Sequence, residues 1–406
     1  MPALTNIGCL ATCAAGAGQA DAGLIPNAAL AWEDGRIVFA GPEERLPPLV
    51  RDDVRDAGGR LVIPGLVDCH THLAFGGWRA EEFEQRIIGR TYLEIAAAGG
   101  GIASTMRATR AAGTDALARR AARVLEGMLE LGVTTVECKS GYGLDLEHEL
   151  RLLRVYAQLA RTAAQRLVPT LLAAHVVPPE YRDRREAYVR LIMEQIVPAA
   201  ARDRLARCCD VFVEASAFSV DEARRILLAG RAAGLAPRLH ADQLGASGGA
   251  ELAAEVGALS ADHLECVTPA GIAALRAAGV VGVSLPIATL YLGQRPMPAR
   301  SLIEAGVAVA VATDFNPGSA PSWHLPLALT LACTLQRMTP AEGLKAATLY
   351  AARAVGLEGE VGSLEAGKAA DFAIVDAADP REWLYHFRPN ACVETVVSGV
   401  TRWRAG

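Results

Sequence analysis

The segment that most constrains the fold of this chain is residues 62–72, VIPGLVDCHTH. An apolar run passes through a Pro-Gly pair and ends in two histidines, His70 and His72, separated by one residue. If Gly65 to His72 form a β-strand, alternate side chains share a face, so both imidazoles point the same way. Two neighbouring imidazoles at the end of a buried strand are half of a metal site. They are equally the polar residues with which a strand leaves a core, and the rest of the chain has to separate these two interpretations.

The composition predicts a large buried core. Of 406 residues, 51% are hydrophobic and 21% are charged, which argues against a disordered chain. The net charge is −5 and no long basic run occurs, so nucleic acid is not an expected partner. The nine cysteines are scattered without a C-x-x-C pair, as is typical of reduced thiols. The first basic residue is Arg36 and no apolar run of about 18 residues occurs, so we expect a cytoplasmic protein without signal peptide or membrane span.

Both ends of the chain contain short β-like segments. Residues 28–32 and 36–41 flank an Asp34-Gly35 turn, which is a hairpin signature. Residues 371–375 and 393–399 have the same strand-like character near the other terminus. We therefore expect the two ends to assemble into one small sheet domain.

Between these ends, apolar strand candidates alternate with Ala-, Leu- and Arg-rich helical stretches, the pattern of parallel βα units. The eight strand candidates are residues 65–70, 133–139, 169–175, 210–216, 237–241, 259–264, 280–285 and 307–313. Helical stretches between them include residues 114–131, 146–161, 221–234 and 249–257. Eight strands predict an α/β fold with a closed, TIM-like (β/α)8 barrel over residues 64–364, and a composite β-sandwich domain from residues 1–63 and 365–406. The alternative, an open doubly wound sheet, usually carries a Gly-rich phosphate turn where this chain has His-Thr-His.

Polar residues gather at the carboxyl ends of the strand candidates, where barrel enzymes keep their active sites. Five of the eight histidines fall there, namely His70, His72, His175, His240 and His263. The last strand candidate runs into Asp314 and Asn316. The other three histidines lie in expected helix or loop, and we expect surface or packing roles for His148, His324 and His386.

A hydrolytic metal site needs neutral imidazoles and a carboxylate, with one position left for water, and the sequence supplies His70, His72, His240 and Asp314. Asp314 can contact the metal and also accept the proton of the water. His263 is placed to hydrogen-bond the attacked carbonyl or to carry a proton, although it can instead orient Asp314. Lys139 could in principle bridge a second metal as a carbamate, but we expect a single ion. Zn²⁺ and Fe³⁺ both suit this donor set.

Several motifs give the chain a resemblance to a known family. They are PGLVDCHTH (64–72), GWRAEEF (77–83), AAAGGGI (96–102), KSGYGLD (139–145), HADQ (240–243), DFNPGS (314–319) and GSLEAGKAADF (362–372). In these motifs, which extend over nearly the whole chain, it resembles the amidohydrolase superfamily and, more narrowly, the imidazolonepropionase family. The resemblance implies hydrolytic ring opening of 4-imidazolone-5-propanoate to N-formimidoyl-L-glutamate, a step of histidine degradation. It also implies a homodimer.

The implied substrate is a small anion with a cyclic amide, and the resemblance assigns its binding to Arg79, Tyr142, His175, Gln243, Asn316, Gly318 and Ser319. Arg79 can hold the propanoate with two N–H groups, unless it is an ordinary surface arginine. Tyr142 lies in a Ser-Gly-Tyr-Gly turn, where we expect a lid that adds a hydroxyl. His175 would face the imidazolone ring, or else is a core histidine.

Gln243 stands where some members of the family carry Glu. An amide side chain cannot take a proton at neutral pH. We therefore expect Gln243 to hydrogen-bond the ring nitrogens and to leave proton transfer to Asp314 and His263.

Two other functions stay open at this stage. A deaminase of the same superfamily would act on a purine or pyrimidine ring and would not need an arginine beside a propanoate tail. A barrel that serves only as an assembly scaffold would be expected to lack some of the metal ligands, whereas this chain has all four.

Overall fold

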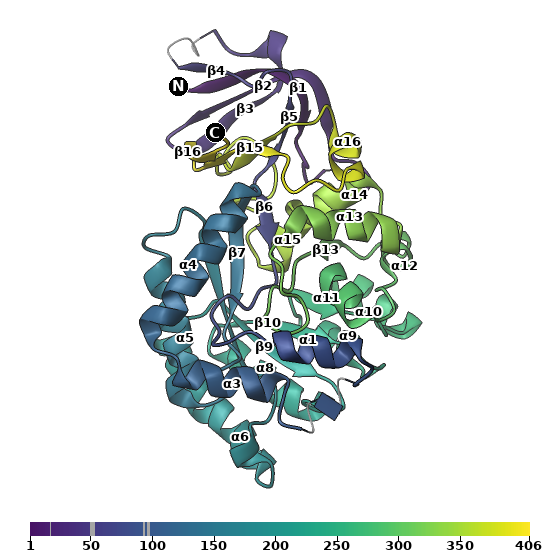
Figure 1. The fold of residues 1–406 in the computed structure, drawn as a ribbon. Coiled ribbons are helices and arrows are strands. Elements are labelled where there is room, and N and C mark those ends of the chain that lie inside the picture. Colours follow the sequence, from purple (N-terminus) through teal and green to yellow (C-terminus); the bar gives the residue numbers. More distant parts are fainter. Residues whose placement is uncertain (17, 49–52, 92–93, 96–97) are drawn as a thin grey trace.

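The computed structural model describes residues 1–16, 18–48, 53–91, 94–95 and 98–406, and it contains two eight-stranded sheets (Figure 1). Ala96 and Ala97 of the AAAGGGI motif lie outside the described residues. Both termini of the chain belong to one sheet, and the middle of the chain forms the other (Figure 1).

The first sheet is built from both ends of the chain, as predicted. Its strands are β1 (Ala3–Ala11), β2 (Leu24–Glu33), β3 (Arg36–Pro42), β4 (Val54–Asp56), β5 (Leu61–Pro64), β14 (Phe372–Val375), β15 (Cys392–Val397) and β16 (Val400–Arg404). They follow the order β16-β15-β14-β5-β1-β2-β3, and β4 pairs with β1. The predicted hairpin joins β2 to β3, with positive φ at Asp34 (47°) and Gly35 (74°) as a tight hairpin turn requires. This sheet has its own small core, in which the rings of Trp32 and Phe372 lie 5.2 Å apart.

The second sheet is the predicted parallel barrel. Its strands are β6 (Leu66–Asp68), β7 (Val133–Lys139), β8 (Arg166–Ala174), β9 (Cys208–Val213), β10 (Ala236–Ala241), β11 (Ser260–His263), β12 (Val281–Ser284) and β13 (Val309–Val311). They neighbour one another in sequence order and every pair is parallel. All eight predicted strands are present, with ends shifted by a few residues. The predicted domain boundaries after residues 63 and 364 stay predictions.

The barrel closes between β6 and β13. The carboxylate of Asp68 accepts hydrogen bonds from the amide (3.1 Å) and the hydroxyl (2.6 Å) of Thr313. Beyond the strands, Thr71 and Phe315 form a parallel bridge, and the amide of His72 donates to the carbonyl of Phe315 at 2.8 Å. These contacts place the residues that follow β6 beside those that follow β13, so the open-sheet alternative is wrong. The first barrel strand ends at Asp68, two residues earlier than predicted.

Helices surround the barrel, except the last of the chain, which lies beside the sheet of the two termini (Figure 1). They are α1 (Ala80–Ile87), α3 (Ile102–Ala111), α4 (Thr114–Glu130), α5 (Leu146–Leu159), α6 (Arg185–Leu191), α7 (Val197–Arg202), α8 (Val220–Ala232), α9 (Gly249–Glu255), α10 (Pro269–Ala278), α11 (Pro286–Leu292), α12 (Ala299–Glu304), α13 (Leu325–Gln336), α14 (Pro340–Ala346), α15 (Leu349–Ala354) and α16 (Pro380–Tyr385). Short helical turns add η1 (Glu43–Arg45), η2 (Pro179–Tyr181) and η3 (Ile192–Ile196).

The four predicted helices correspond to α4, α5, α8 and α9. The first residue of helix α8 is fixed by hydrogen bonds between side chains and backbone at its N-terminus. The hydroxyl of Ser219 accepts from the amide of Glu222, and the Glu222 carboxylate accepts from the amide of Ser219, so two otherwise unpaired N–H groups are satisfied. Among the described helices, none is long and apolar enough to cross a membrane.

Candidate active site

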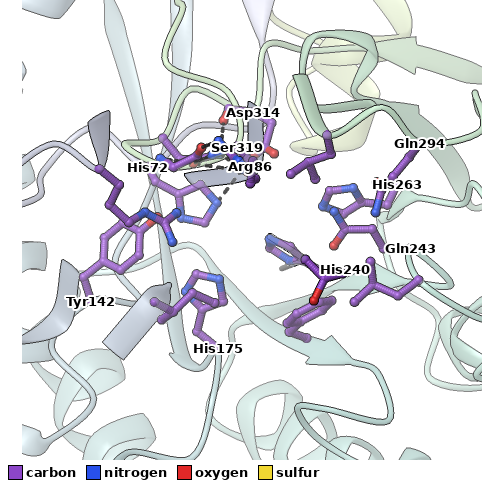
Figure 2. A pocket seen from close by; sticks show the side chains of 18 of the residues that line it. His72, Arg86, Tyr142, His175, His240, Gln243, His263, Gln294, Asp314 and Ser319 are labelled. Carbon is purple, nitrogen blue, oxygen red and sulfur yellow. Dashed lines mark hydrogen bonds and ion pairs between the residues drawn. The ribbon is translucent and has the colours of Figure 1, made fainter. Parts of the chain in front are cut away.

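Three histidines converge at the carboxyl end of the barrel. His70 and His72 follow β6 and His240 belongs to β10, and one ring nitrogen from each lies within 4.8 Å of the others. The carboxylate of Asp314, which follows β13, lies 3.4 Å from Nε2 of His70 and 3.5 Å from Nε2 of His72. All four side chains are buried. Figure 2 shows His72, His240 and Asp314 around one cavity.

Two of these rings are held by buried carboxylates. Nδ1 of His70 donates to Asp262 at 2.6 Å, and Nδ1 of His240 donates to Asp210 at 3.1 Å. In the neutral form of each ring, Nε2 then keeps its lone pair, and neither Nε2 has a hydrogen-bond partner among the described residues. Burial lowers the pKa of His70 well below its ordinary value, so the ring is neutral. Buried imidazoles that can offer an Nε2 lone pair beside a carboxylate fit a divalent metal ion.

Beneath these ligands lies a network of buried charges. The ammonium group of Lys139 donates to Glu137 at 3.0 Å and to Asp210 at 2.7 Å. The guanidinium of Arg238 donates to Asp262 at 2.9 Å and lies 3.6 Å from Glu137. All five side chains have no exposed surface. The carbamate considered for Lys139 is not supported, because two carboxylates already hold its amino group.

Sequence reasoning missed this network, although strand alternation carried a signal for it. Glu137 and Lys139 are two residues apart on β7, and Arg238 and His240 are two residues apart on β10. Residues at this spacing share a face, so the charged residues point into the barrel as His240 does.

A cavity of about 250 Å³ opens beside the histidine cluster. Most of the predicted site residues line it, namely His72, Arg79, Tyr142, His175, His240, Gln243, His263, Asp314, Asn316, Gly318 and Ser319. His70 is wholly buried behind them. In Figure 2, Tyr142 and His72 lie on one side of the cavity, and Gln243 and His263 lie on the other. The lining also includes residues that sequence reasoning missed, among them Arg86, Arg90, Phe212 and Gln294.

His263 and Asp314 reach the cavity through unusual backbone conformations. Their φ angles are 81° and 53°, which non-glycine residues rarely adopt. Nδ1 of His263 lies 3.7 Å from Oε2 of Glu265. Burial lowers the pKa of His263, but the nearby carboxylate of Glu265, together with those of Asp314 and Asp262, outweighs it and raises that pKa. Burial raises the pKa of Asp314, but the hydrogen bond from His72 and the neighbouring imidazoles outweigh it, so the carboxylate is ionised.

The Arg79 side chain lies against the loop that follows Asp314. Only 7% of this side chain is exposed, so it is not a surface arginine. A Cβ atom added to Gly318 would lie 1.4 Å from Nη2 of Arg79, which shows how closely the guanidinium packs on that glycine. Oδ1 of Asn316 accepts from the amides of Gly318 and Ser319, both at 2.8 Å, and fixes the loop.

Arg86 adds a second guanidinium to the same wall. It donates to the carbonyl of Gly318 at 3.0 Å and lies 4.8 Å from the centre of the Tyr291 ring. It follows Arg79 at a spacing of about two helical turns, a signal that could have placed both on one face of α1. With Arg79 and Arg90, it gives the cavity a positively charged wall.

Tyr142 and His175 belong to the cavity wall. Only 2% of Tyr142 is exposed, so the prediction of a lid at this position is wrong and the ring is part of the core. The ring of His175 stacks on that of His72, with centres 5.3 Å apart, and its Nδ1 donates to the carbonyl of Gly141 at 2.9 Å. The histidines expected at the surface or in packing, His148, His324 and His386, lie outside the cavity lining.

Comparison with known proteins places this chain in a family. A profile of the Amidohydrolase family matches residues 61–401. The imidazolonepropionase of Myxococcus xanthus (strain DK1622) is 53% identical over 365 residues, which are 89% of this chain and 86% of that protein. The imidazolonepropionase of Geobacillus kaustophilus (strain HTA426) is 47% identical over 386 residues, covering 94% of this chain and 91% of that protein.

Solved structures show the same fold at lower sequence identity. The 5-methylcytosine deaminase from Klebsiella pneumoniae, liganded with phosphonocytosine, superposes with a TM-score of 0.76 at 17% identity, over 100% of this chain and 98% of that one. At this identity the likeness concerns the fold alone.

Proposed function

The chain belongs to the amidohydrolase family and, within it, to the imidazolonepropionases, and from this premise we propose how its cavity opens the ring of 4-imidazolone-5-propanoate with water. The product of this hydrolysis is N-formimidoyl-L-glutamate, in the degradation of histidine. One observation carries the assignment of the reaction to this cavity: a cluster of imidazoles and an ionised carboxylate shares it with arginines, two of which have a buried Nε atom.

We assign the metal ligands to His70, His72, His240 and Asp314. The free Nε2 lone pairs of His70 and His240, and the short distances from Asp314 to two of the rings, support this assignment. When bound, a divalent ion polarises a carbonyl and lowers the pKa of water to about 7, which makes a nucleophile available at neutral pH.

The substrate carboxylate binds to the arginine wall of the cavity. The Nε atoms of Arg79 and Arg86 are buried without a hydrogen-bond partner among the described residues, and a bound carboxylate would satisfy such donors. Arg79 takes the principal role, because its guanidinium lies beside the loop of Asn316 and Gly318. This places the propanoate at the wall and leaves the ring to reach the histidine cluster.

The ring itself is held by polar groups from several sides of the cavity. Gln243 hydrogen-bonds the ring nitrogens, and Tyr142, His175 and Ser319 complete the contacts, all from residues that line the cavity. An amide at position 243 positions the ring without exchanging protons.

Proton transfer falls to Asp314 and His263. The ionised carboxylate of Asp314 accepts a proton from the attacking water. His263, whose pKa is raised, donates a proton or a hydrogen bond as the amide C–N bond breaks and the leaving nitrogen becomes an N–H group. Neither step uses Gln243.

Zinc or iron at this site, a homodimer and a cytoplasmic location stay predictions from the sequence. Metal quantification on the purified protein distinguishes the two metals. Three imidazoles and one carboxylate accept either ion.

The proposed function is tested by following the loss of imidazolone absorbance with the purified enzyme, before and after a chelator. We expect turnover that is lost on chelation and restored by a divalent ion, and no release of ammonia from cytosine or guanine. Deamination of either base, or full imidazolone turnover without bound metal, would contradict the proposal.

A further inference from the structure

We propose that Lys139 is a positioning residue of the metal site, which holds Asp210 and Asp262 and, through them, the rings of His240 and His70 in the orientation and tautomer that a divalent ion requires. Lys139 neither lines the cavity nor belongs to the proposed ligand set. The inference rests on the proposed metal site and extends it to a residue one layer deeper in the barrel.

Two chains of contacts start at the ammonium group of Lys139. In one, Nζ lies 2.7 Å from Oδ2 of Asp210, whose Oδ1 lies 3.1 Å from Nδ1 of His240. In the other, Nζ lies 3.7 Å from Oδ2 of Asp262, and the same oxygen lies 2.6 Å from Nδ1 of His70. Both chains end at an Nε2 atom without a hydrogen-bond partner among the described residues.

Lys139 is the link between these two chains. Arg238 also contacts Asp262, at 2.9 Å, but the ion pairs of the described residues join Arg238 to Asp262 and Glu137 and not to Asp210. The ion pairs that contact both carboxylates are those of Lys139. One side chain on β7 therefore supports ligands that come from β6 and β10.

The balance of buried charge explains why the side chain that joins Asp210 to Asp262 has to be a cation. Three carboxylates, Glu137, Asp210 and Asp262, share a fully buried space with two cations, Lys139 and Arg238. Without Lys139, three anions would face one cation in a medium where like charges repel strongly. The carboxylates would turn away from one another and from the ring nitrogens that they now hold.

A ring that loses its carboxylate also loses its fixed tautomer. An Nδ1–H group without an acceptor no longer keeps the ring proton away from Nε2. An imidazole with its proton on Nε2 offers no lone pair at the point where the ligands converge. Loss of Lys139 should therefore weaken metal binding although Lys139 touches no metal, an effect that such supporting groups exert at about 10- to 100-fold.

Lys139→Met tests this inference, because it keeps most of the length of the side chain and removes its charge. The readout is zinc affinity, measured by competition with a chelator on the folded protein, and we expect a loss of about 10- to 100-fold. The matched control is Lys345→Met. Lys345 is also fully buried, but it donates to the carbonyls of Gly18 and Asp21 at 3.0 Å in another part of the chain. This control should lower the melting temperature and leave zinc affinity unchanged.

A double-mutant cycle tests the path of the effect. If Lys139 acts through Asp210, the loss in Lys139→Met combined with Asp210→Asn is smaller than the product of the two single losses. Zinc affinity at the wild-type level in Lys139→Met, with stability lowered as in Lys345→Met, would show a structural role only and overturn the inference.

If Lys139→Met does not fold, Asp210→Asn decides the question. It leaves Lys139 in place and weakens the link to His240, so unchanged zinc affinity in this variant would overturn the inference. Failure of the proposed function gives a different result, because the wild-type protein would then not turn over the imidazolone, whatever its zinc affinity.

Discussion

The imidazole of His263 and the carboxylate of Glu265 face each other inside the barrel, with Nδ1 of His263 3.7 Å from Oε2 of Glu265. Neither atom has a hydrogen-bond partner among the described residues, and both side chains are buried. The hydroxyl of Thr289 donates to the other oxygen of Glu265 at 3.0 Å and fixes the carboxylate in place. Glu265 is therefore positioned to stabilise the charged form of His263.

This pairing predicts a shift in the pH profile of Glu265→Gln. Burial lowers the pKa of His263, but Glu265, with smaller contributions from Asp314 and Asp262, offsets it, so the net shift is upward. If protonated His263 is the proton donor, activity is present below its pKa and falls as the pH rises through it. Removing the charge of Glu265 lowers that pKa, so the alkaline limb of kcat/KM moves to lower pH.

The control for this experiment is Glu304→Gln, which changes a carboxylate that is 68% exposed on α12. Its alkaline limb should coincide with that of the wild type. An unshifted limb in Glu265→Gln would mean that Glu265 does not act on His263.

The roles of the polar groups predict different kinetic defects in three alanine variants. Asp314→Ala and His263→Ala remove proton transfer, so kcat should fall by about 10²- to 10⁴-fold. Gln243→Ala removes hydrogen bonds to the ring, so it should mainly raise KM. Steady-state kinetics on the three variants separate these effects. A large loss of kcat with unchanged KM in Gln243→Ala would contradict the assignment of Gln243 to binding alone.

Much of the fold followed from the sequence because each barrel strand is a short apolar run between helical stretches. The paired histidines after the first strand, and the histidines at the ends of later strands, indicated the catalytic end of the barrel. The closing contact between Asp68 and Thr313 was not predictable, because it replaces strand pairing by a side chain. The periodicity of apolar residues indicates which residues of a strand are buried, but it does not indicate which hydrogen bonds the last residues form.

The buried charges were missed for a related reason. Glu137 and Arg238 interrupt apolar strands, and a charged residue in a strand is usually exposed, so their burial depends on partners from distant parts of the chain. The positive φ of His263 could not be predicted either. Strand alternation along β11 would point the His263 side chain away from the face on which Asp262 lies. The sequence patterns predicted the candidate metal ligands, but they did not predict the buried charged residues that support these ligands.

The arginine wall predicts how Arg79 variants bind substrate. Arg79→Ala should raise KM with a smaller change in kcat, because a charge-assisted contact to the propanoate is worth about 1.5–3 kcal/mol, or about 10- to 100-fold. Arg79→Lys should recover part of the loss, since lysine keeps the charge but not the paired geometry. Kinetics with the imidazolone substrate measure both. Equal KM values in the wild type and Arg79→Ala would remove Arg79 from the binding site.

The close packing of Arg79 on Gly318 predicts that a methyl group added at position 318 weakens substrate binding as the loss of Arg79 does. The three atoms nearest to a Cβ at position 318 all belong to the Arg79 guanidinium, at 1.4, 1.8 and 2.2 Å. A flexible side chain can move aside, so Gly318→Ala should cost little stability but displace the guanidinium and raise KM by about 10-fold or more. Gly359→Ala is the control, because a Cβ there meets no atom within 4 Å. If Gly318→Ala acts through Arg79, it should add almost nothing to the KM of Arg79→Ala, and fully additive effects would show that the glycine serves the substrate in another way.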